Sequence, residues 1–216
     1  MFWITGATGL VGSHVLVELL KKGEPIVAFY HHQLPESIAH FLQFKQMSPF
    51  QHLITWRSMQ EWDWSEEPVQ CEGLFHCAAL VSYHAKDHRA MNEVNVEGTA
   101  HWVNWALEFN VPICHVSSIA ALGKSEHGNE VDEHCFWQPS KEHTEYARTK
   151  FLSEMEVWRG IEEGLSAVMV NPGVVIGPCL PHQSSGKIFQ TVARGFNAYP
   201  LGGTGFVAAQ DVARAM

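Results

Sequence analysis

The sequence is poor in basic residues and contains no basic run. Its 216 residues carry 14 Lys and Arg against 23 Asp and Glu, a formal net charge of −9. Proteins bind nucleic-acid backbones and anionic membranes mainly through Lys and Arg, so this balance argues against both as the main partner. We therefore expect no nucleic-acid partner and no membrane partner. An anionic small molecule stays possible, because a local pocket can differ in charge from the whole chain.

Membrane-spanning and targeting patterns are also lacking. No apolar run approaches the ~20 residues of a membrane span, and the N-terminal MFWITGATGL has no basic region before its apolar residues, as a signal peptide would. The five cysteines include no C-x-x-C pair, which favours reduced thiols in a cytoplasmic protein. The fourteen histidines form no ligand quartet with the spacing of a zinc site, so we expect no metal.

Short apolar runs alternate with helical patterns along the chain. A composition of 46% hydrophobic and 17% charged residues supports a buried core. The expected strands are 2–5, 25–30, 52–56, 73–79, 111–118 and 166–173. Helical patterns cover residues 13–22, 86–109 and 142–163. This alternation predicts an α/β fold, a Rossmann-type doubly wound parallel sheet with helices on both faces.

Two stretches interrupt this rhythm. Residues 123–141 are polar without periodicity, and residues 177–206 are rich in Gly, Pro and Ser. Long loops after parallel strands are common ligand-binding segments. We expect a dinucleotide-binding domain over 1–176 and the start of a smaller substrate-binding region over 177–216. The chain stops in what resembles the first turns of a helix, which suggests a fragment.

The segment TGATGLVG places three glycines directly between an expected strand and an expected helix. Gly6 permits the tight turn, Gly9 lets the backbone approach a pyrophosphate, and Gly12 lets helix and strand pack closely. The phosphates would then contact N–H groups at the helix N-terminus. A lone glycine triplet is weak evidence, but this strand-to-helix context is the one that dinucleotide binding requires.

The expected second strand ends in AFYHHQ, which bears on the choice of dinucleotide. NAD specificity usually involves an acidic residue at this point, and none occurs before Glu36. His31 or His32 could instead approach a 2′-phosphate, as an arginine does in other proteins. We therefore expect NADP as cofactor, with NAD as the alternative.

The segment TEYARTK places Tyr146 and Lys150 four residues apart, on one face of the expected helix. A phenol titrates near ~10, so a proton-exchanging tyrosine needs its pKa lowered by about three units, worth roughly 4 kcal/mol. A neighbouring ammonium and an oxidised nicotinamide both favour the phenolate and act in that direction. Such a pair also arises by chance on exposed helices, so other motifs must decide its meaning.

Six ordered motifs resemble the extended short-chain dehydrogenase/reductase superfamily, also called the NAD-dependent epimerase/dehydratase family. They are TGATGLVG, HCAALV (76–81), NVEGT (95–99), VSSIAALG (116–123), YARTK (146–150) and NPGVVIGP (171–178). The resemblance covers essentially the whole chain. The IAALG ending is most similar to the branch that contains dihydroflavonol reductases.

The resemblance implies a role for each matching residue. Tyr146 would be the general acid/base, Lys150 its electrostatic partner, Ser118 a hydrogen-bond donor to the reacting oxygen, and Asn95 a brace of the active site. Asn95 could equally be a helix N-cap or a buried structural amide. With the glycine loop and the histidines, the expected cofactor-binding set is Thr5, Gly6, Thr8, Gly9, Leu10, Val11, Gly12, His31, His32, Cys77, Ala78, Ala79, Val81, Lys150, Asn171, Pro172, Gly173 and Val174.

Three functions remain open on the sequence alone. Ile119, Ala120 and Ala121 follow the serine where a dehydratase carries an acid and a base, so dehydration is disfavoured. Expected pocket residues suit an apolar or aromatic carbonyl: Val81, Tyr83, Leu122, Phe136, Trp137 and Phe189. We expect a reductase of a ketone or aldehyde, acting as a homodimer. A nucleotide-sugar epimerase and a non-catalytic NAD(P)-binding protein are the alternatives.

Overall fold

The protein consists of two compact units. The computed structural model describes residues 1–31, 34, 36–65, 70–123, 131–140, 143–178, 191–195 and 203–216. Residues 1–77 and 173–216 form the first unit, and residues 78–172 form the second unit. The boundary expected at residue 176 divides a dinucleotide-binding domain from the start of a substrate-binding region. It stays a prediction.

Four parallel strands, in the order β3-β2-β1-β4, form the sheet of the first unit. Their bounds are β1 Phe2–Thr5, β2 Ile26–Tyr30, β3 Ile54–Ser58 and β4 Gly73–His76. Each lies within two residues of its expected start. Both neighbours of β1 run parallel to it, so residues that follow β1 and β4 emerge at the same, carboxyl, edge.

Helix α1 (Leu10–Lys21) supplies the core of the first unit, as its spacing predicts. Val15, Leu16, Leu19 and Leu20 are buried in a cluster with residues of β1 and β2. Burial of each such side chain contributes about 1.5–3 kcal/mol of hydrophobic free energy. The helix begins three residues earlier than expected, directly at the glycine loop, and Gly23 follows its end with a left-handed φ of 74°.

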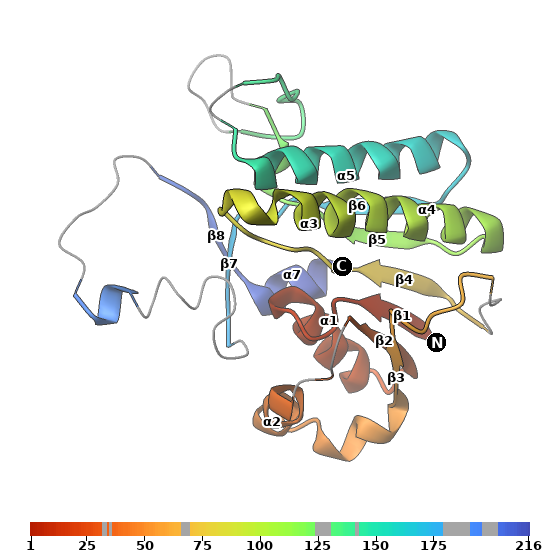
Figure 1. Ribbon diagram of the computed structural model, residues 1–216. Helices are drawn as coiled ribbons and strands as arrows, with labels where there is room; N and C mark the ends of the chain where they lie inside the picture. Colours follow the sequence, from red (N-terminus) through yellow and green to blue (C-terminus); the bar gives the residue numbers. More distant parts are fainter. Residues whose placement is uncertain are drawn as a thin grey trace. The chain divides into compact units, whose positions relative to one another are not determined.

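Several elements of the first unit were not predicted. Helix α2 spans Glu36–Phe44, the 3-10 helix η1 spans Ser48–Leu53, and the parallel pair β7–β8 consists of Val174–Ile176 and Phe206–Ala208. These strands have three residues each, too few to show a periodic pattern. Helix α7 (Ala209–Ala215) confirms the expected helical end of the chain and packs against α1 (Figure 1).

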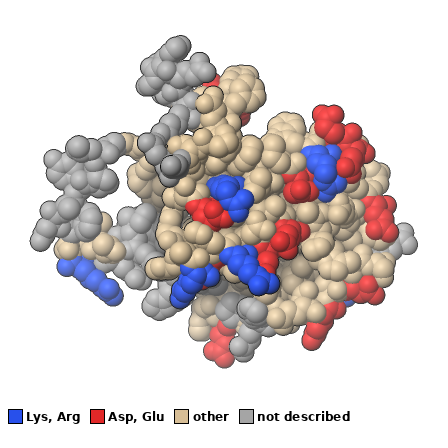
Figure 2. Space-filling view, turned by 45° about the horizontal axis from the view of Figure 1, so that its top comes forward, with Lys and Arg blue, Asp and Glu red and all other residues tan. Residues whose placement is uncertain are grey.

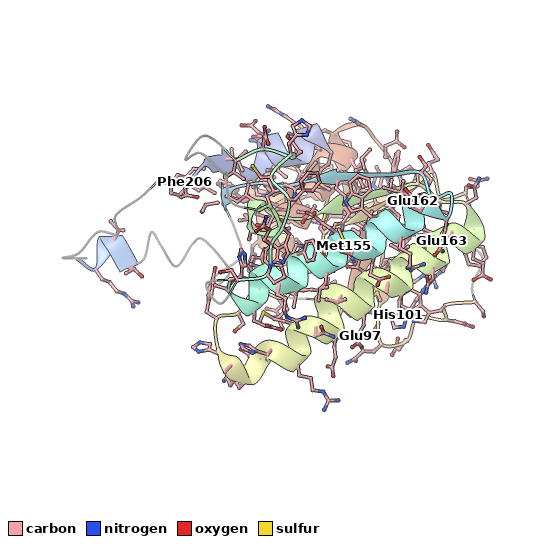
Figure 3. All side chains as sticks on the ribbon, turned by 90° about the horizontal axis from the view of Figure 1, so that it is seen from above. Glu97, His101, Met155, Glu162, Glu163 and Phe206 are labelled. Carbon is pink, nitrogen blue, oxygen red and sulfur yellow. The ribbon has the colours of Figure 1, made fainter. Side chains whose placement is uncertain are left out.

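The second unit carries the parallel strands β5 (Ile113–Val116) and β6 (Ala167–Val170). Helix α4 (Gly98–Phe109) lies alongside α5 (Glu145–Glu162), as Figures 1 and 3 both show. The expected helix over 86–109 is in fact segmented. It comprises the 3-10 turn Ala85–Asp87, α3 (His88–Asn92), the π-helical turn Glu93–Glu97 and α4.

Parallel strands with helices between them confirm the expected α/β class. Figure 2 shows Lys and Arg atoms beside Asp and Glu atoms, rather than gathered in one basic patch on this face. Ion pairs between neighbouring helix residues include Lys21 with Glu18 at 2.7 Å and Arg159 with Glu156 at 2.9 Å. No helix within the described ranges combines the length and apolar character that crossing a bilayer requires.

Candidate functional site

The glycine loop of the first unit is shaped by close backbone contacts. Gly6 follows β1 with a left-handed φ of 65°, and the Gly9 N–H donates to the Gly6 carbonyl oxygen at 2.8 Å. A Cβ atom on Gly12 would lie only 2.2 Å from that same oxygen. The loop is thus folded so tightly that no side chain fits at Gly12, which is the packing role that the sequence predicts.

The loop also offers backbone donors to an anion. Gly9 is the N-cap of α1. Because glycine has no side chain, this residue leaves the helix end uncovered. The N–H groups of the first helical turn have no intrahelical acceptor, and the helix dipole favours a negative charge there. A bare loop before a helix N-terminus fits the pyrophosphate of a dinucleotide. Leu10 and Gly12 are buried, while Thr8, Gly9 and Val11 are half-buried.

Thr5 and His76 meet at the carboxyl ends of β1 and β4. The Thr5 Oγ1 and His76 Nδ1 atoms lie 2.7 Å apart, and both residues are buried. Thr5 therefore links the ends of β1 and β4 beside the glycine loop. Its contact with a cofactor stays a prediction. His31 is exposed after β2, whereas His32 lies outside the described residues.

The second unit brings Ser118, Tyr146 and Lys150 together. Ser118 follows β5 and caps the 3-10 turn Ile119–Ala121, its Oγ accepting from the Ala120 N–H at 3.1 Å. Tyr146 and Lys150 lie in α5, whose first turn is capped by the Thr144 hydroxyl. The Ser118 side chain lies near the Tyr146 phenol, where hydrogen bonding to it lowers the pKa of that phenol. Tyr146 and Lys150 thus lie in one helix, as their spacing predicts, and their catalytic roles stay predictions.

Burial has the largest effect on the pKa of the Tyr146 phenol. Burial raises the pKa of the phenol above its ordinary value, hydrogen bonding by Ser118 lowers that pKa, and the electrostatic effect of Tyr83 raises it slightly. Lys150 is 2% exposed and donates to the Val116 carbonyl oxygen at 2.8 Å. From the sequence, the Lys150 ammonium and an oxidised nicotinamide are expected to lower this pKa. The pKa is raised instead, because burial outweighs the effect of Ser118, and the contribution of a nicotinamide stays a prediction.

Asn95 lies in the π-helical turn and joins three segments of the second unit. Its Oδ1 accepts from the Leu80 N–H at 2.7 Å, and its Nδ2 donates to the Leu80 carbonyl oxygen and to Thr149 Oγ1, each at 3.0 Å. π-Turns often occur at functional sites. Thr149 precedes Lys150 directly, so Asn95 braces α5 beside the two residues of interest. This geometry fits the bracing role rather than a helix N-cap.

The remaining expected cofactor contacts fall in both units. Asn171 and Pro172 follow β6, and the Ile119 N–H donates to the Pro172 carbonyl oxygen at 3.1 Å. A Cβ on Gly173 would lie 2.4 Å from the Gly205 carbonyl oxygen, so close packing alone requires this glycine. Val174 begins β7. Cys77 follows β4 and ends the N-terminal segment of the first unit, while Ala78, Ala79 and Val81 lie at the start of the second unit.

Exposed apolar side chains occur on the loops of the second unit. Val81, Tyr83, Ile119 and Phe136 are all exposed. Trp137, in contrast, stacks on His143 and Phe151 with ring centroids 3.9 Å and 4.9 Å away. Phe189 lies outside the described residues. Among the residues that the structure describes, no three His, Cys, Asp or Glu side chains gather as a metal site requires.

Sequence reasoning missed the polar residues that support the site. Ser117, Thr149 and Glu154 are buried and hydrogen-bonded around Ser118 and α5. One signal was available for Glu154, because it continues the four-residue spacing of Tyr146 and Lys150 along the same helix face.

Comparison with known proteins supports this reading of the motifs. A family model described as "NAD dependent epimerase/dehydratase family" matches residues 2–216. "Putative dihydroflavonol 4-reductase" of Synechocystis sp. is 28% identical over 216 residues, covering 98% of this chain and 60% of its own. "Sterol demethylase protein B" of Methylococcus capsulatus is 33% identical over 176 residues, covering 81% of this chain and 51% of its own. The chain therefore spans only about half to three fifths of these curated relatives.

A solved structure shows the same fold. The yeast methylglyoxal/isovaleraldehyde reductase Gre2 complexed with NADPH superposes with a TM-score of 0.79. The match covers 99% of this chain and 70% of that chain at 17% sequence identity. At that identity the likeness speaks for the fold alone, and it agrees with the Rossmann-type architecture expected from the sequence.

Proposed function

The chain belongs to the NAD-dependent epimerase/dehydratase family, and from that premise we propose that it is an NAD(P)-dependent reductase of a ketone or aldehyde. The observation that carries the proposal is the pairing of Ser118 with Tyr146, whose pKa the Ser118 side chain lowers, with Lys150 one turn further along α5. A protein that only binds the cofactor has no need for a serine beside the half-buried phenol of Tyr146.

Each unit has its own task in this proposal. The glycine loop of the first unit holds the pyrophosphate, and a reduced nicotinamide supplies the hydride when bound. Tyr146 gives its hydroxyl proton to the carbonyl oxygen, which gains negative charge as the hydride arrives. Ser118 holds the Tyr146 hydroxyl and can donate to the same oxygen. The Lys150 ammonium favours the phenolate that remains.

The residues after Ser118 and the names of the relatives favour reduction. Ile119, Ala120 and Ala121 carry no group that moves a proton, which disfavours a dehydratase. The exposed Val81, Tyr83 and Phe136 suit an apolar or aromatic carbonyl better than a sugar diphosphate. A relative covering most of the chain is described as a dihydroflavonol 4-reductase. The family description itself favours the second candidate, a nucleotide-sugar epimerase with the same tyrosine.

A screen with the full-length protein separates these candidates. NADPH and NADH absorbance is followed with a panel of aliphatic and aromatic ketones and aldehydes, and sugar nucleotides are tested for interconversion. Net consumption of reduced cofactor is expected with at least one carbonyl. Interconversion of sugar nucleotides without net consumption would establish the epimerase instead. Cofactor binding with neither reaction would leave a non-catalytic binding protein.

A further inference from the structure

A buried carboxyl group lies one helical turn beyond Lys150. Glu154 is 7% exposed, whereas its neighbour Met155 is 39% exposed on α5, where Figure 3 labels it. Residues four apart share a helix face, so Glu154 continues the row begun by Tyr146 and Lys150. Burying a carboxyl group is unfavourable unless it is hydrogen-bonded. The partners of Glu154 therefore show what the residue does.

Two donors from neighbouring strand ends converge on one oxygen of Glu154. Its Oε1 accepts from the Ser117 hydroxyl and from the Asn171 Nδ2 at 2.5 Å. Ser117 follows β5, and Asn171 follows β6. The same two strand ends are joined through their backbones, since the Ser117 N–H donates to the Val170 carbonyl oxygen at 2.8 Å. Glu154 thus fixes the two side chains at the point where both strands end.

The network continues from Asn171 to Ser118. The Asn171 Nδ2 that contacts Glu154 also donates to the Ser118 carbonyl oxygen at 3.2 Å. Ser118 in turn contacts the Tyr146 hydroxyl through its side chain. Hydrogen bonds therefore lead from Glu154 through Asn171 to Ser118, whose side chain acts on the Tyr146 phenol, and Glu154 itself lies two helical turns from Tyr146.

We propose that Glu154 is a positioning residue, which orients Asn171 and through it holds Ser118 in place against Tyr146. The inference rests on the proposed function, because Ser118 and Tyr146 are its catalytic pair. It predicts that losing the acceptor at position 154 changes the chemical step more than the cofactor affinity. A purely structural Glu154 would change only the stability of the fold.

The decisive variant is Glu154→Leu in the full-length protein. Leucine fills similar space but accepts no hydrogen bond, so kcat/KM is expected to fall on the order of 10- to 100-fold, as for a small misplacement of a catalytic group. The dissociation constant for NADP(H) should change by less than about twofold, well under the tenfold that 1.4 kcal/mol represents. Glu154→Gln retains an oxygen acceptor and should restore kcat/KM to within about threefold of the native value.

Val157→Ala is the matched control. Val157 lies in α5, is fully buried, and has no part in the hydrogen-bond network. Its truncation removes buried packing contacts and leaves a small cavity, which destabilises the fold. It should lower the melting temperature while leaving kcat/KM within about twofold, a change of under 0.5 kcal/mol in the barrier. Equal activity losses in Val157→Ala and Glu154→Leu would overturn the proposal, because instability would then explain both.

A titration of the cofactor-free protein tests the positioning role of Glu154 without any need for substrate or turnover. Ultraviolet absorbance reports phenolate formation, and the difference from a matching Tyr146→Phe variant isolates Tyr146 among the four tyrosines. The Ser118 hydrogen bond lowers the pKa of Tyr146, so displacing Ser118 must raise it. Glu154→Leu should shift this titration to higher pH, and Val157→Ala should not. Tyr83 also faces the phenol and is unchanged in both variants.

The outcomes are distinct. If no carbonyl is reduced but Glu154→Leu still shifts the titration, the proposed function fails and the positioning role stands. An unshifted titration with native kcat/KM overturns the positioning role, whatever the substrate. Should Glu154→Leu not fold, Asn171→Ala replaces it in the cofactor-free titration. Asn171→Ala removes the hydrogen bond to the Ser118 carbonyl oxygen, while Glu154 still accepts from the Ser117 hydroxyl. An unchanged Tyr146 pKa in this variant would again overturn the proposal.

Discussion

The glycine loop of the first unit and the Ser118–Tyr146 site of the second unit are built in opposite ways. The loop is local, because its shape comes from backbone contacts within residues 5–12 and depends on side chains being absent. The other site is assembled by hydrogen bonds between residues 34 to 54 positions apart. Adding one carbon atom to a glycine should therefore damage the loop. Removing one polar side-chain atom should damage the Ser118–Tyr146 site.

Tyr146→Phe removes one polar atom and should have the largest effect. The ring and its packing remain, so the melting temperature should be unchanged. No proton can then reach the carbonyl oxygen, and kcat should fall on the order of 10²–10⁴, about 3–5 kcal/mol of barrier. Steady-state kinetics with the substrate found by screening, together with calorimetric titration of the cofactor, measures both effects. Residual kcat above about a tenth of the native value would show that this hydroxyl is not the general acid.

Lys150→Met serves as the comparison for that variant. The ammonium is expected to hold the nicotinamide ribose as well as to favour the phenolate, so its loss should weaken cofactor binding in addition to kcat. Tyr146→Phe should leave cofactor binding nearly intact. If both variants bound the cofactor as tightly as the native protein, the ribose contact assigned to Lys150 would be wrong.

Gly12→Ala adds one carbon to the loop and should mainly affect cofactor binding. The new Cβ would lie 2.2 Å from the Gly6 carbonyl oxygen and 2.8 Å from its carbonyl carbon, so the loop has to open. A shift costing about 1.4 kcal/mol of binding free energy already weakens binding tenfold, and we expect at least about that loss in calorimetric titration.

Gly98→Ala is the matched control for the loop variant. A Cβ there would lie 3.5 Å from the Glu93 carbonyl oxygen, an ordinary contact, at the first residue of α4. Alanine is the better helix former, so the variant should gain up to about 1 kcal/mol of stability and keep the native cofactor affinity. Native affinity in Gly12→Ala as well would mean that the loop tolerates a side chain and that its glycines do not shape the binding site.

The same contrast explains which features could be predicted from the sequence. The strand, glycine turn and helix of the first unit follow from neighbouring residues, and the prediction of each was confirmed apart from the earlier start of α1. The pair Tyr146 and Lys150 was found because helix spacing alone places both on one face. These features require no knowledge of distant parts of the chain.

Helix spacing places Glu154 on the face of Tyr146 and Lys150, but neighbouring residues indicate neither its burial nor the turn around Asn95. A glutamate within a helix usually faces solvent, and only Ser117 and Asn171, distant in sequence, make its burial favourable. The expected single helix over 86–109 contains a π-turn where Asn95 contacts Leu80 and Thr149. Local propensity favours a regular helix there, and tertiary hydrogen bonds override it.

The choice of cofactor should give the smallest effect, because it depends on His31, which is exposed after β2, and on His32. If His31 or His32 contacts a 2′-phosphate, NADP(H) should bind several-fold tighter than NAD(H), a difference of about 1 kcal/mol. Changing both histidines to Asp should reverse that order, since a carboxylate repels the phosphate and accepts from a ribose hydroxyl. Changing His88 and His101 to Asp adds the same two charges in the second unit and should leave the order unaltered. Calorimetric titrations in which the native chain prefers NAD(H), or in which the control pair reverses the order equally well, would show that these histidines do not select the cofactor.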